Sequence, residues 1–272
     1  MIAEVRCEGA PRDLDLDQGI ACREAIRADA RAGGASRLRE VAARVGLSVR
    51  SRHAALARDL RRHFPHLAER TDGLASGAGV SSGALLAKLA REFGRPDASL
   101  LEDAGVEAGV SDSLWASFRA PLSEAGIIVR RVRPDGGYPN LTLGRPGLAA
   151  SLAGVNEPGL AMAGIVLAPP GIGEACQAPA LLLVEGCLER LDGVEKALEW
   201  CERRPGGGRA RLVFADAAGA SGAIEIDGEK RQRIDAARGA SAGAPPGVRI
   251  EPAARCLAIE LPGRPIERFG LG

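Results

Sequence analysis

The sequence is poor in the residues that most often build catalytic, metal and nucleic-acid sites. Aromatic side chains make up only 3% of its 272 residues, which leaves little for a surface that stacks against bases. None of its six cysteines forms a Cys-x-x-Cys pair, and its three histidines lie far from them in sequence. We therefore expect structural thiols, and neither a metal nor a cofactor. The cysteines are Cys7, Cys22, Cys176, Cys187, Cys201 and Cys256.

An excess of charge of either sign is also lacking. The 36 basic and 35 acidic residues leave a formal net charge of +1, so no long-range field draws the protein to nucleic acid or to an anionic membrane. No stretch approaches the ~20 apolar residues of a membrane span, and charges within residues 1–6 speak against a signal peptide. We expect a soluble, cytoplasmic protein that binds a small molecule or a protein partner, with homo- or hetero-oligomers left open.

The sequence does contain enough apolar material for one domain, because 46% of its residues are hydrophobic. Residues 1–96 are rich in Ala, Arg and Leu, which predicts a mainly helical leading segment. Residues 97–126 are expected to form a linker or a degenerate nucleophile region. Residues 127–272 show short β-rich runs with Gly and Pro between them, and helical spacing at 178–203. The pattern predicts a single α+β domain over residues 1–272.

Local signals indicate where some helices begin. Ser81 is placed to cap a helix whose apolar residues recur every four positions up to Phe93. Asp192 with Glu195 has the spacing of a capping box. The basic stretch 51–66 could bind nucleic acid, but we expect it to be the solvated side of a helix.

Three segments resemble one known family in their order and spacing. Residues 9–14 read Gly-Ala-Pro-Arg-Asp-Leu, residues 72–80 read Asp-Gly-Leu-Ala-Ser-Gly-Ala-Gly-Val, and residues 153–161 read Ala-Gly-Val-Asn-Glu-Pro-Gly-Leu-Ala. Together they are similar to the penicillin acyltransferase family of N-terminal-nucleophile hydrolases, which includes acyl-coenzyme A:isopenicillin N acyltransferase and bacterial amide hydrolases. The resemblance implies a four-layer αββα sandwich behind the helical leading segment.

The resemblance also implies a chemistry for which this chain lacks the residues. Members of the family cut their own chain before a cysteine, and the freed α-amine, which titrates near ~8, acts as base for the new terminal thiol. The corresponding window, residues 93–126, contains no cysteine and no threonine. Ser113 and Ser117, in its most strand-like stretch, are the fallback nucleophiles. Surface or turn serines are the favoured interpretation.

Two further sequence motifs of the family are absent from this chain. A Gly-Arg-Asn-x-Asp hairpin should precede residue 127, but Ser117 stands where Asn belongs and Arg119 where Asp belongs. A Thr-Asn-His segment should follow the late strands, but no histidine follows His66. Residues 238–247 read instead as an Ala/Gly/Pro loop, which suggests that the late helices of the family were lost.

The segment around Asn156 predicts a structured turn between two strands without any appeal to a family. Gly154 and Gly159 permit backbone geometry that other residues resist, and Asn156 can bond neighbouring amides. A role in serving the backbone is favoured over contact with a substrate. With Glu157 and Arg119, these residues are the candidates for lining a former substrate cleft.

These observations favour a non-catalytic homologue that keeps the scaffold to bind a ligand or a protein. The alternative is an active amidase or acyltransferase that acts on a small amide or acyl-thioester through Ser117 or Ser113. Nucleic-acid binding through residues 50–62 is the weakest hypothesis, because the net charge is near zero.

Overall fold

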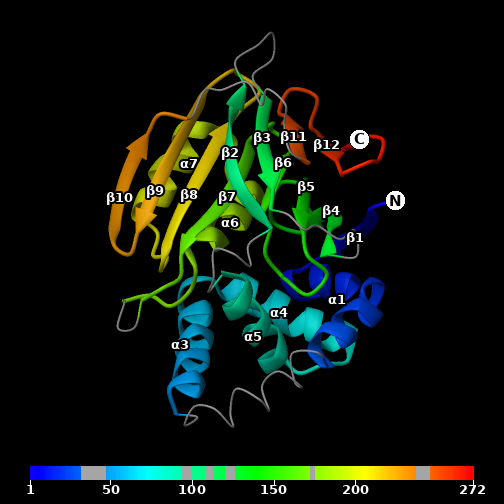
Figure 1. Cartoon of the computed structure of the whole chain (residues 1–272), viewed down its shortest axis with the longest axis vertical. Coiled ribbons are helices and arrows are strands. Elements are labelled where there is room, and N and C mark those ends of the chain that lie inside the picture. Colours follow the sequence, from blue (N-terminus) through cyan, green and yellow to red (C-terminus); the bar gives the residue numbers. More distant parts are fainter. Residues whose placement is uncertain (32–46, 94–99, 108–112, 120–125, 172–174, 237–245) are drawn as a thin grey trace.

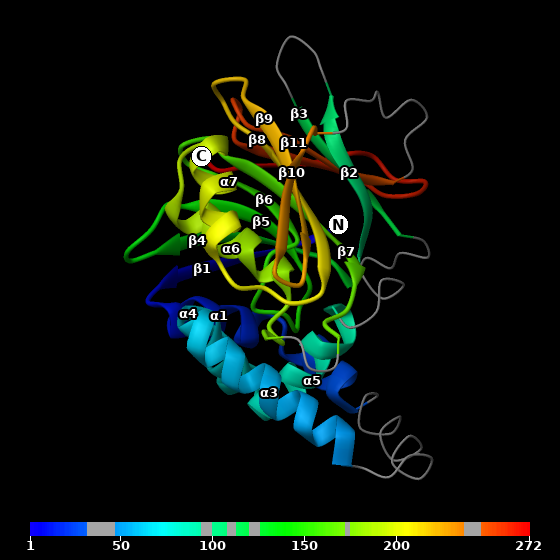
Figure 2. The ribbon, with the colours of Figure 1, turned by 90° about the vertical axis from the view of Figure 1, so that its left-hand side faces the viewer.

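Two β-sheets form the centre of the protein (Figures 1 and 2). The structure, a computed structural model, describes all residues except 32–46, 94–99, 108–112, 120–125, 172–174 and 237–245. The larger sheet has eight strands in the order β1-β4-β5-β6-β7-β8-β9-β10. Its strands are β1 (Ala3–Gly9), β4 (Ile128–Pro134), β5 (Asn140–Gly144), β6 (Ala153–Asn156), β7 (Ala161–Ala168), β8 (Arg209–Ala215), β9 (Ser221–Asp227) and β10 (Lys230–Ile234).

The smaller sheet has five strands in the order β13-β12-β11-β3-β2, and all its neighbours are antiparallel. Its strands are β2 (Leu101–Glu107), β3 (Ser113–Phe118), β11 (Gly247–Glu251), β12 (Cys256–Glu260) and β13 (Glu267–Gly270). β2 and β3 thus arise from the segment 97–126, and β3 lies in its most strand-like stretch. In the larger sheet β1 pairs parallel to β4, with Ala3 opposite Ile128, and the other neighbours are antiparallel.

The two sheets pack face to face, with β2 and β3 lying against β7 and β8. Side chains from both sheets fill the space between them and belong to one apolar cluster. Period-two alternation decides which side chains enter it, because successive residues of a strand point to opposite faces. Leu114, Ala116 and Phe118 of β3 enter this core, and the residues between them point the other way.

Helices cover the opposite face of the eight-stranded sheet. α6 (Leu183–Arg190) packs on β6 and β7, and α7 (Val194–Arg203) packs on β9 (Figure 2). α1 (Pro11–Ala21) packs on β1 and β4. The remaining helices, α3 (Leu47–His63), α4 (Pro65–Ala78) and α5 (Ser82–Phe93), form a layer at the same end as α1.

Glycines bring α1 and α4 into very close contact. A Cβ atom on Gly73 would collide with the carbonyl oxygen of Arg12, and one on Gly77 would collide with that of Leu16. A Cβ on Gly19 would lie 2.5 Å from the oxygen of Leu74. The two backbones therefore touch at a crossing that only glycine permits, and this crossing fixes the side chains of α1 relative to those of α4.

The mixed α/β architecture was predicted, but the expected four layers are not all seen. In the ranges that the structure describes, the order is helices, eight-stranded sheet, five-stranded sheet, and no helix lies on the outer side of the five-stranded sheet (Figure 2). That outer face carries polar positions such as Arg249 and Arg268, which are exposed. A polar face of this kind tolerates solvent without a helical cover.

One predicted helix start is confirmed and one is wrong. Ser81 Oγ accepts a hydrogen bond from the Ala84 backbone N–H at 3.3 Å, as expected of a cap. The predicted capping box at Asp192 does not form, because Gly193 is the N-cap residue and makes no side-chain bond. The Val194 N–H donates to Asp216 Oδ2 at 3.0 Å, so a distant strand end caps this helix instead.

Candidate functional site

The two fallback serines lie on the wrong face of β3 for chemistry between the sheets. Ser113 and Ser117 alternate with the core residues of β3, so they share the outer face with Trp115. Ser117 lies opposite Gly247 of β11 and Asp103 of β2. Each serine is only 6% exposed. Both side chains therefore point away from the apolar core between the two sheets.

Arg119 follows directly on β3 and lies far from the Asn156 turn. Its backbone N–H donates to the Leu100 oxygen at 2.9 Å, and its Nη1 lies 3.9 Å from Glu102 Oε2. It thus sits beyond the Gly247 end of β11, whereas Gly159 lies near Pro252, beyond the other end. The five residues of β11 separate these ends by roughly 17 Å at the usual rise per residue. The structure does not bring Arg119 and Asn156 into one cleft.

Asn156 is fully buried, and its side chain bonds only backbone groups. Its Nδ2 donates to the Leu188 oxygen at 3.0 Å and to the Leu191 oxygen at 2.6 Å. Its Oδ1 accepts from the N–H groups of Gly159 at 3.2 Å and Leu160 at 2.8 Å. The amide therefore uses both donors and both acceptor positions, and ties the β6–β7 turn to the end of α6.

The neighbours of Asn156 serve the same turn. Gly159 has a φ of +98°, and a Cβ there would lie 2.6 Å from Ala217 Cβ. A Cβ on Gly154 would lie 2.6 Å from the Leu141 oxygen across the β5–β6 pair. Glu157 is exposed, and only its backbone is bound in the turn, through an N–H that donates to the Pro139 oxygen at 2.8 Å. None of these three residues presents a reactive group to a cavity.

A buried ionic cluster, which the sequence did not reveal, joins the helices to the sheet. Its centre is Arg70 of α4, which is 0% exposed. Arg70 Nε lies 2.9 Å from Asp15 Oδ1 of α1, and its Nη1 lies 2.5 Å from Glu185 Oε1 and 2.6 Å from Glu189 Oε1 of α6. One guanidinium thus contacts three carboxylates on two other helices.

Arg130 of β4 is the second guanidinium of the ionic cluster and is also 0% exposed. Its Nη2 donates to Glu185 Oε2 at 2.8 Å and to Ser151 Oγ at 2.6 Å, and its Nε donates to Thr142 Oγ1 at 3.2 Å. Its Nη1 donates to Gln18 Oε1 at 3.2 Å. Gln18 in turn donates to three backbone carbonyls, those of Arg145, Pro146 and Leu148.

The ionic cluster shifts the pKa values of its members in different directions. Burial alone would raise the pKa of Glu185, but Arg130 and Arg70 lower it to about 2. Burial raises the pKa of Asp15 despite the two arginines, and burial also raises that of Glu189. Burial opposes the charge of Arg70, yet the three carboxylates raise its pKa well above the usual value. Hydrogen bonds from two guanidinium groups and Ser151 explain why Glu185 remains ionised.

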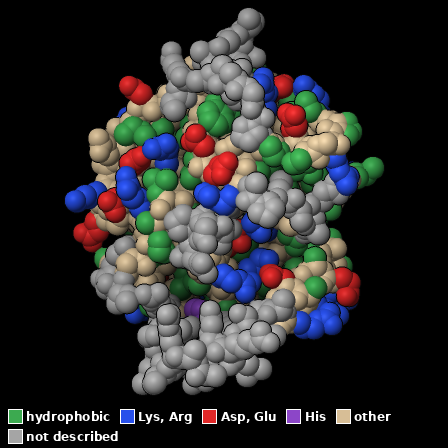
Figure 3. All heavy atoms as spheres, viewed as in Figure 1, with side chains coloured by type: hydrophobic (Ala, Val, Ile, Leu, Met, Phe, Trp, Pro, Cys, Tyr) green, Lys and Arg blue, Asp and Glu red, His purple; other side chains and the backbone are tan. Residues whose placement is uncertain are grey.

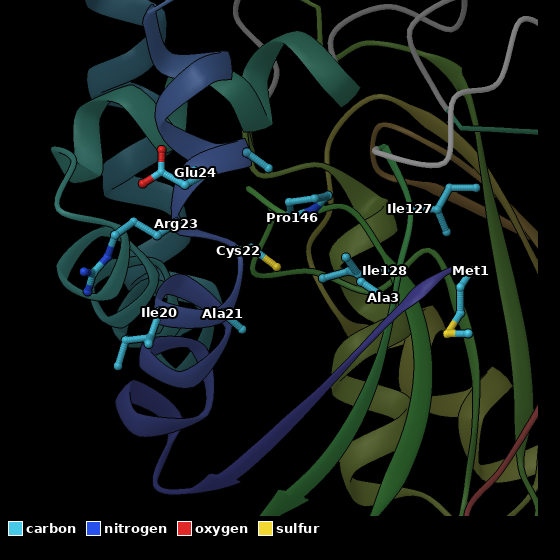
Figure 4. A pocket seen from close by; sticks show the side chains of 11 residues that line it. Met1, Ala3, Ile20, Ala21, Cys22, Arg23, Glu24, Ile127, Ile128 and Pro146 are labelled. Atoms are coloured by element: carbon cyan, nitrogen blue, oxygen red, sulfur yellow. The ribbon is translucent and has the colours of Figure 1, made fainter.

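A surface pocket lies elsewhere, between the end of α1 and the β1 edge of the sheet (Figure 4). Its volume is about 630 Å³. Ile20 and Cys22 line one side of it, and Ala3 and Ile128 line the other. In Figure 4 Arg23 points away from the pocket, in keeping with the hydrogen bond from its Nε to the Gly77 oxygen at 3.1 Å. The pocket walls are thus mainly apolar.

The face of the molecule drawn in Figure 3 shows no large patch of one charge. On the face seen in Figure 3, basic and acidic side chains are interspersed with apolar ones. Within the described ranges, no three His, Cys, Asp or Glu side chains are grouped so that they could hold a metal ion. The helices in those ranges are too short or too polar to cross a bilayer.

Comparison with known proteins leaves the family open. No family model and no curated protein matches the chain. Among solved structures, the chain is similar to penicillin V acylase from Agrobacterium tumefaciens, with 17% identity and a TM-score of 0.37. The match covers 49% of this chain and 49% of the acylase, so the chain spans about half the length of that protein.

Proposed function

We propose that this protein is a non-catalytic binding or assembly protein built on a reduced form of the N-terminal-nucleophile hydrolase scaffold. One observation carries the proposal: the strand that replaces the nucleophile region, β3, sends Leu114, Ala116 and Phe118 into the space between the sheets. A family member would need a thiol or hydroxyl there. Here the same positions contribute to the core, and Ser113 and Ser117 lie on the opposite face.

Two further observations support the proposal. The Asn156 side chain is fully used by backbone groups, so it has no capacity left for a substrate. The apolar pocket beside Ile20 and Cys22 has the volume of a small-molecule site, and burial raises the pKa of the Cys22 thiol, which disfavours its nucleophilic thiolate form. A small apolar ligand is the chemistry that this pocket suits.

The proposal is tested by the covalent state of the purified chain and its reaction with an acyl probe. Intact mass is expected to show one uncut polypeptide, and a fluorophosphonate or β-lactone probe is expected to leave it unlabelled. Ser117→Ala and Ser113→Ala serve as matched controls for any label that does appear. Two fragments that meet at Ser113 or Ser117, or stoichiometric labelling that either control abolishes, would replace the proposal by the serine amidase or acyltransferase.

A further inference from the structure

The ionic cluster carries one more negative group than positive group. Asp15, Glu185 and Glu189 face Arg70 and Arg130, and the other side chains that bond these groups are Gln18, Ser151 and Thr142, which are neutral. In the part of the chain that the structure describes, no further cation forms an ion pair with the three carboxylates, and Arg190 of α6 acts on Glu189 only from a greater distance, where it lowers the pKa of Glu189 against the rise caused by burial. An uncompensated charge in such a buried place is costly, and a bound proton removes it.

The hydrogen bonds indicate which carboxylate holds that proton. Both oxygens of Glu185 accept from arginine, so this group is ionised. Glu189 Oε1 accepts from Arg70, and its side chain keeps 10% of its exposure to solvent. Asp15 is 0% exposed; its Oδ1 takes all its contacts with Arg70 and Arg130, and its Oδ2 has no hydrogen-bond partner. Of the three carboxylates, Asp15 is therefore the one at which binding a proton costs the least free energy and keeping a negative charge costs the most.

Every element packed around Asp15 contributes to this balance. Arg70 of α4 and Arg130 of β4 favour the ionised form, whereas Glu185 and Glu189 of α6 oppose it. On β1, burial and the charge of Asp15 raise the pKa of the Cys7 thiol to about 12, so this neighbour stays neutral at pH 7 and adds no further negative charge. His66 lies near Arg70 and Glu185, and burial lowers its pKa to about 4, so it too stays neutral at pH 7.

We propose that Asp15 is protonated in the folded protein at neutral pH and that the loss of this proton loosens the docking of α1 and α4 on the sheet. The ionic cluster then acts as a pH-sensitive lock, by which we mean that it holds the helices on the sheet most firmly when Asp15 is neutral and the remaining charges balance. Above the pKa that Asp15 has in the folded state, its bare Oδ2 carries charge in a site without a donor for it. Because α1 and α4 are in contact through their glycines, they respond as a unit.

The sign of the pH dependence follows from proton linkage. The unfolded chain releases the Asp15 proton near the usual pKa of about 3.9, whereas the folded chain keeps it to a higher pH. The stabilisation is fully present below the unfolded pKa and is lost as pH rises through the folded one. Between these two values the unfolding constant gains a factor of about ten per pH unit from this proton.

Urea unfolding of the full chain between pH 5 and pH 7 tests the proposal. Asp15→Asn is expected to flatten the pH dependence of the unfolding constant by about tenfold per pH unit relative to the unmodified chain, because the neutral amide has no proton to lose. Asp13→Asn, at an exposed position of the same helix, is the matched control and is expected to keep the slope of the unmodified chain. An unchanged slope in Asp15→Asn, or removal of the slope by Asp13→Asn instead, would overturn the assignment.

A second measurement keeps the test decisive if Asp15→Asn fails to fold. In unmodified protein labelled with 13C at the aspartate carboxyl carbons, one resonance is expected at the shift of a protonated carboxyl group at pH 7. If all aspartate resonances lie at the ionised shift, the proposal is refuted.

Amide hydrogen exchange measures the conformational change. The protection factors of α1 and α4 are expected to fall above the pKa that Asp15 has in the folded state, while those of β7 and β8 stay constant. Equal loss of protection in both regions would show that no separate lock exists.

Discussion

At the residue scale, buried polar side chains determine how the layers are joined. Asn156 binds the end of α6 to the β6–β7 turn through four backbone bonds, and Arg70 binds α1, α4 and α6 together. Such groups are stable in the interior only when nearly all of their hydrogen-bonding capacity is used. Each is therefore more sensitive to substitution than an apolar neighbour of the same size.

Replacing Asn156 by Ala is expected to lower the free energy of unfolding by about 3 kcal/mol or more, because the Leu160 amide and two carbonyls lose their side-chain partner in a buried site, and the Gly159 amide keeps only the backbone oxygen of residue 156. Urea unfolding with an unchanged m-value measures the effect. Asn140→Ala is the matched control, since Asn140 is equally buried but donates one bond, to Tyr138, and its Oδ1 has no partner. Equal losses for the two variants would contradict the role assigned to Asn156.

The sequence revealed part of this residue-scale picture. The turn at Asn156 was predictable, because two glycines and an asparagine between two apolar strands have few other uses. The ionic cluster was not predictable from the sequence. Asp15, Arg70 and Arg130 look like ordinary surface charges in a chain with 26% charged residues, and only the tertiary contacts show that they are buried. The one weak sign of the cluster in the sequence was the spacing of Glu185 and Glu189. It places two carboxylates on one side of a helix whose other residues before Arg190 are uncharged.

At the element scale, the α1–α4 crossing is the contact on which the helical layer depends. The glycine-rich stretch 72–80 was recognised in the sequence as a motif, and the structure gives it a physical reason in the close approach of two backbones. The strands β2 and β10 were harder to predict, whereas β3 lies in the stretch that the sequence marked as strand-like. β10 carries Lys230, Arg231 and Arg233, and such an edge strand lacks the apolar alternation by which strands are recognised.

Gly73→Ala is expected to separate α1 from α4 and to cost about 3 kcal/mol or more, since overpacking against backbone cannot be relieved by rotating a side chain. Gly83→Ala is the control within the same helical layer. The nearest atom to its new Cβ is Ser81 Oγ at 3.9 Å, so the change is expected to stabilise α5 by roughly 0.5–1 kcal/mol. Thermal unfolding monitored by far-UV circular dichroism compares the two, and a neutral Gly73→Ala would show that the helices can part without cost.

At the scale of the whole molecule, the leading segment and the sandwich share one structure. β1 belongs to the leading segment of the sequence, yet it is the outermost strand of the large sheet beside β4. The ionic cluster crosses the same boundary, because α1 and α4 contribute Asp15 and Arg70 whereas β4 and α6 contribute the rest. Neither part buries its charged groups without the other.

The protein is therefore expected to unfold in one transition. Near-UV signals from Trp115 and Trp200, which lie in the sandwich part, and far-UV helical signal, which comes largely from the leading segment, should give coincident urea curves. Separate expression of residues 1–96 and 97–272 should give two chains without cooperative transitions. Two resolved transitions in the intact chain would contradict a single cooperative unit.

The parallel pairing of β1 with β4 also has a consequence for how the chain is made. The first strand leaves the ribosome long before its neighbour, since Ala3 must wait for Ile128 to be synthesised. During that interval the nascent chain carries Val5 and Cys7, both destined for the interior, with no sheet to receive them. Strand pairings between segments so distant in sequence form slowly, and apolar surface stays exposed to solvent until they form. We therefore expect nascent copies of this chain to expose apolar surface until β4 has been synthesised.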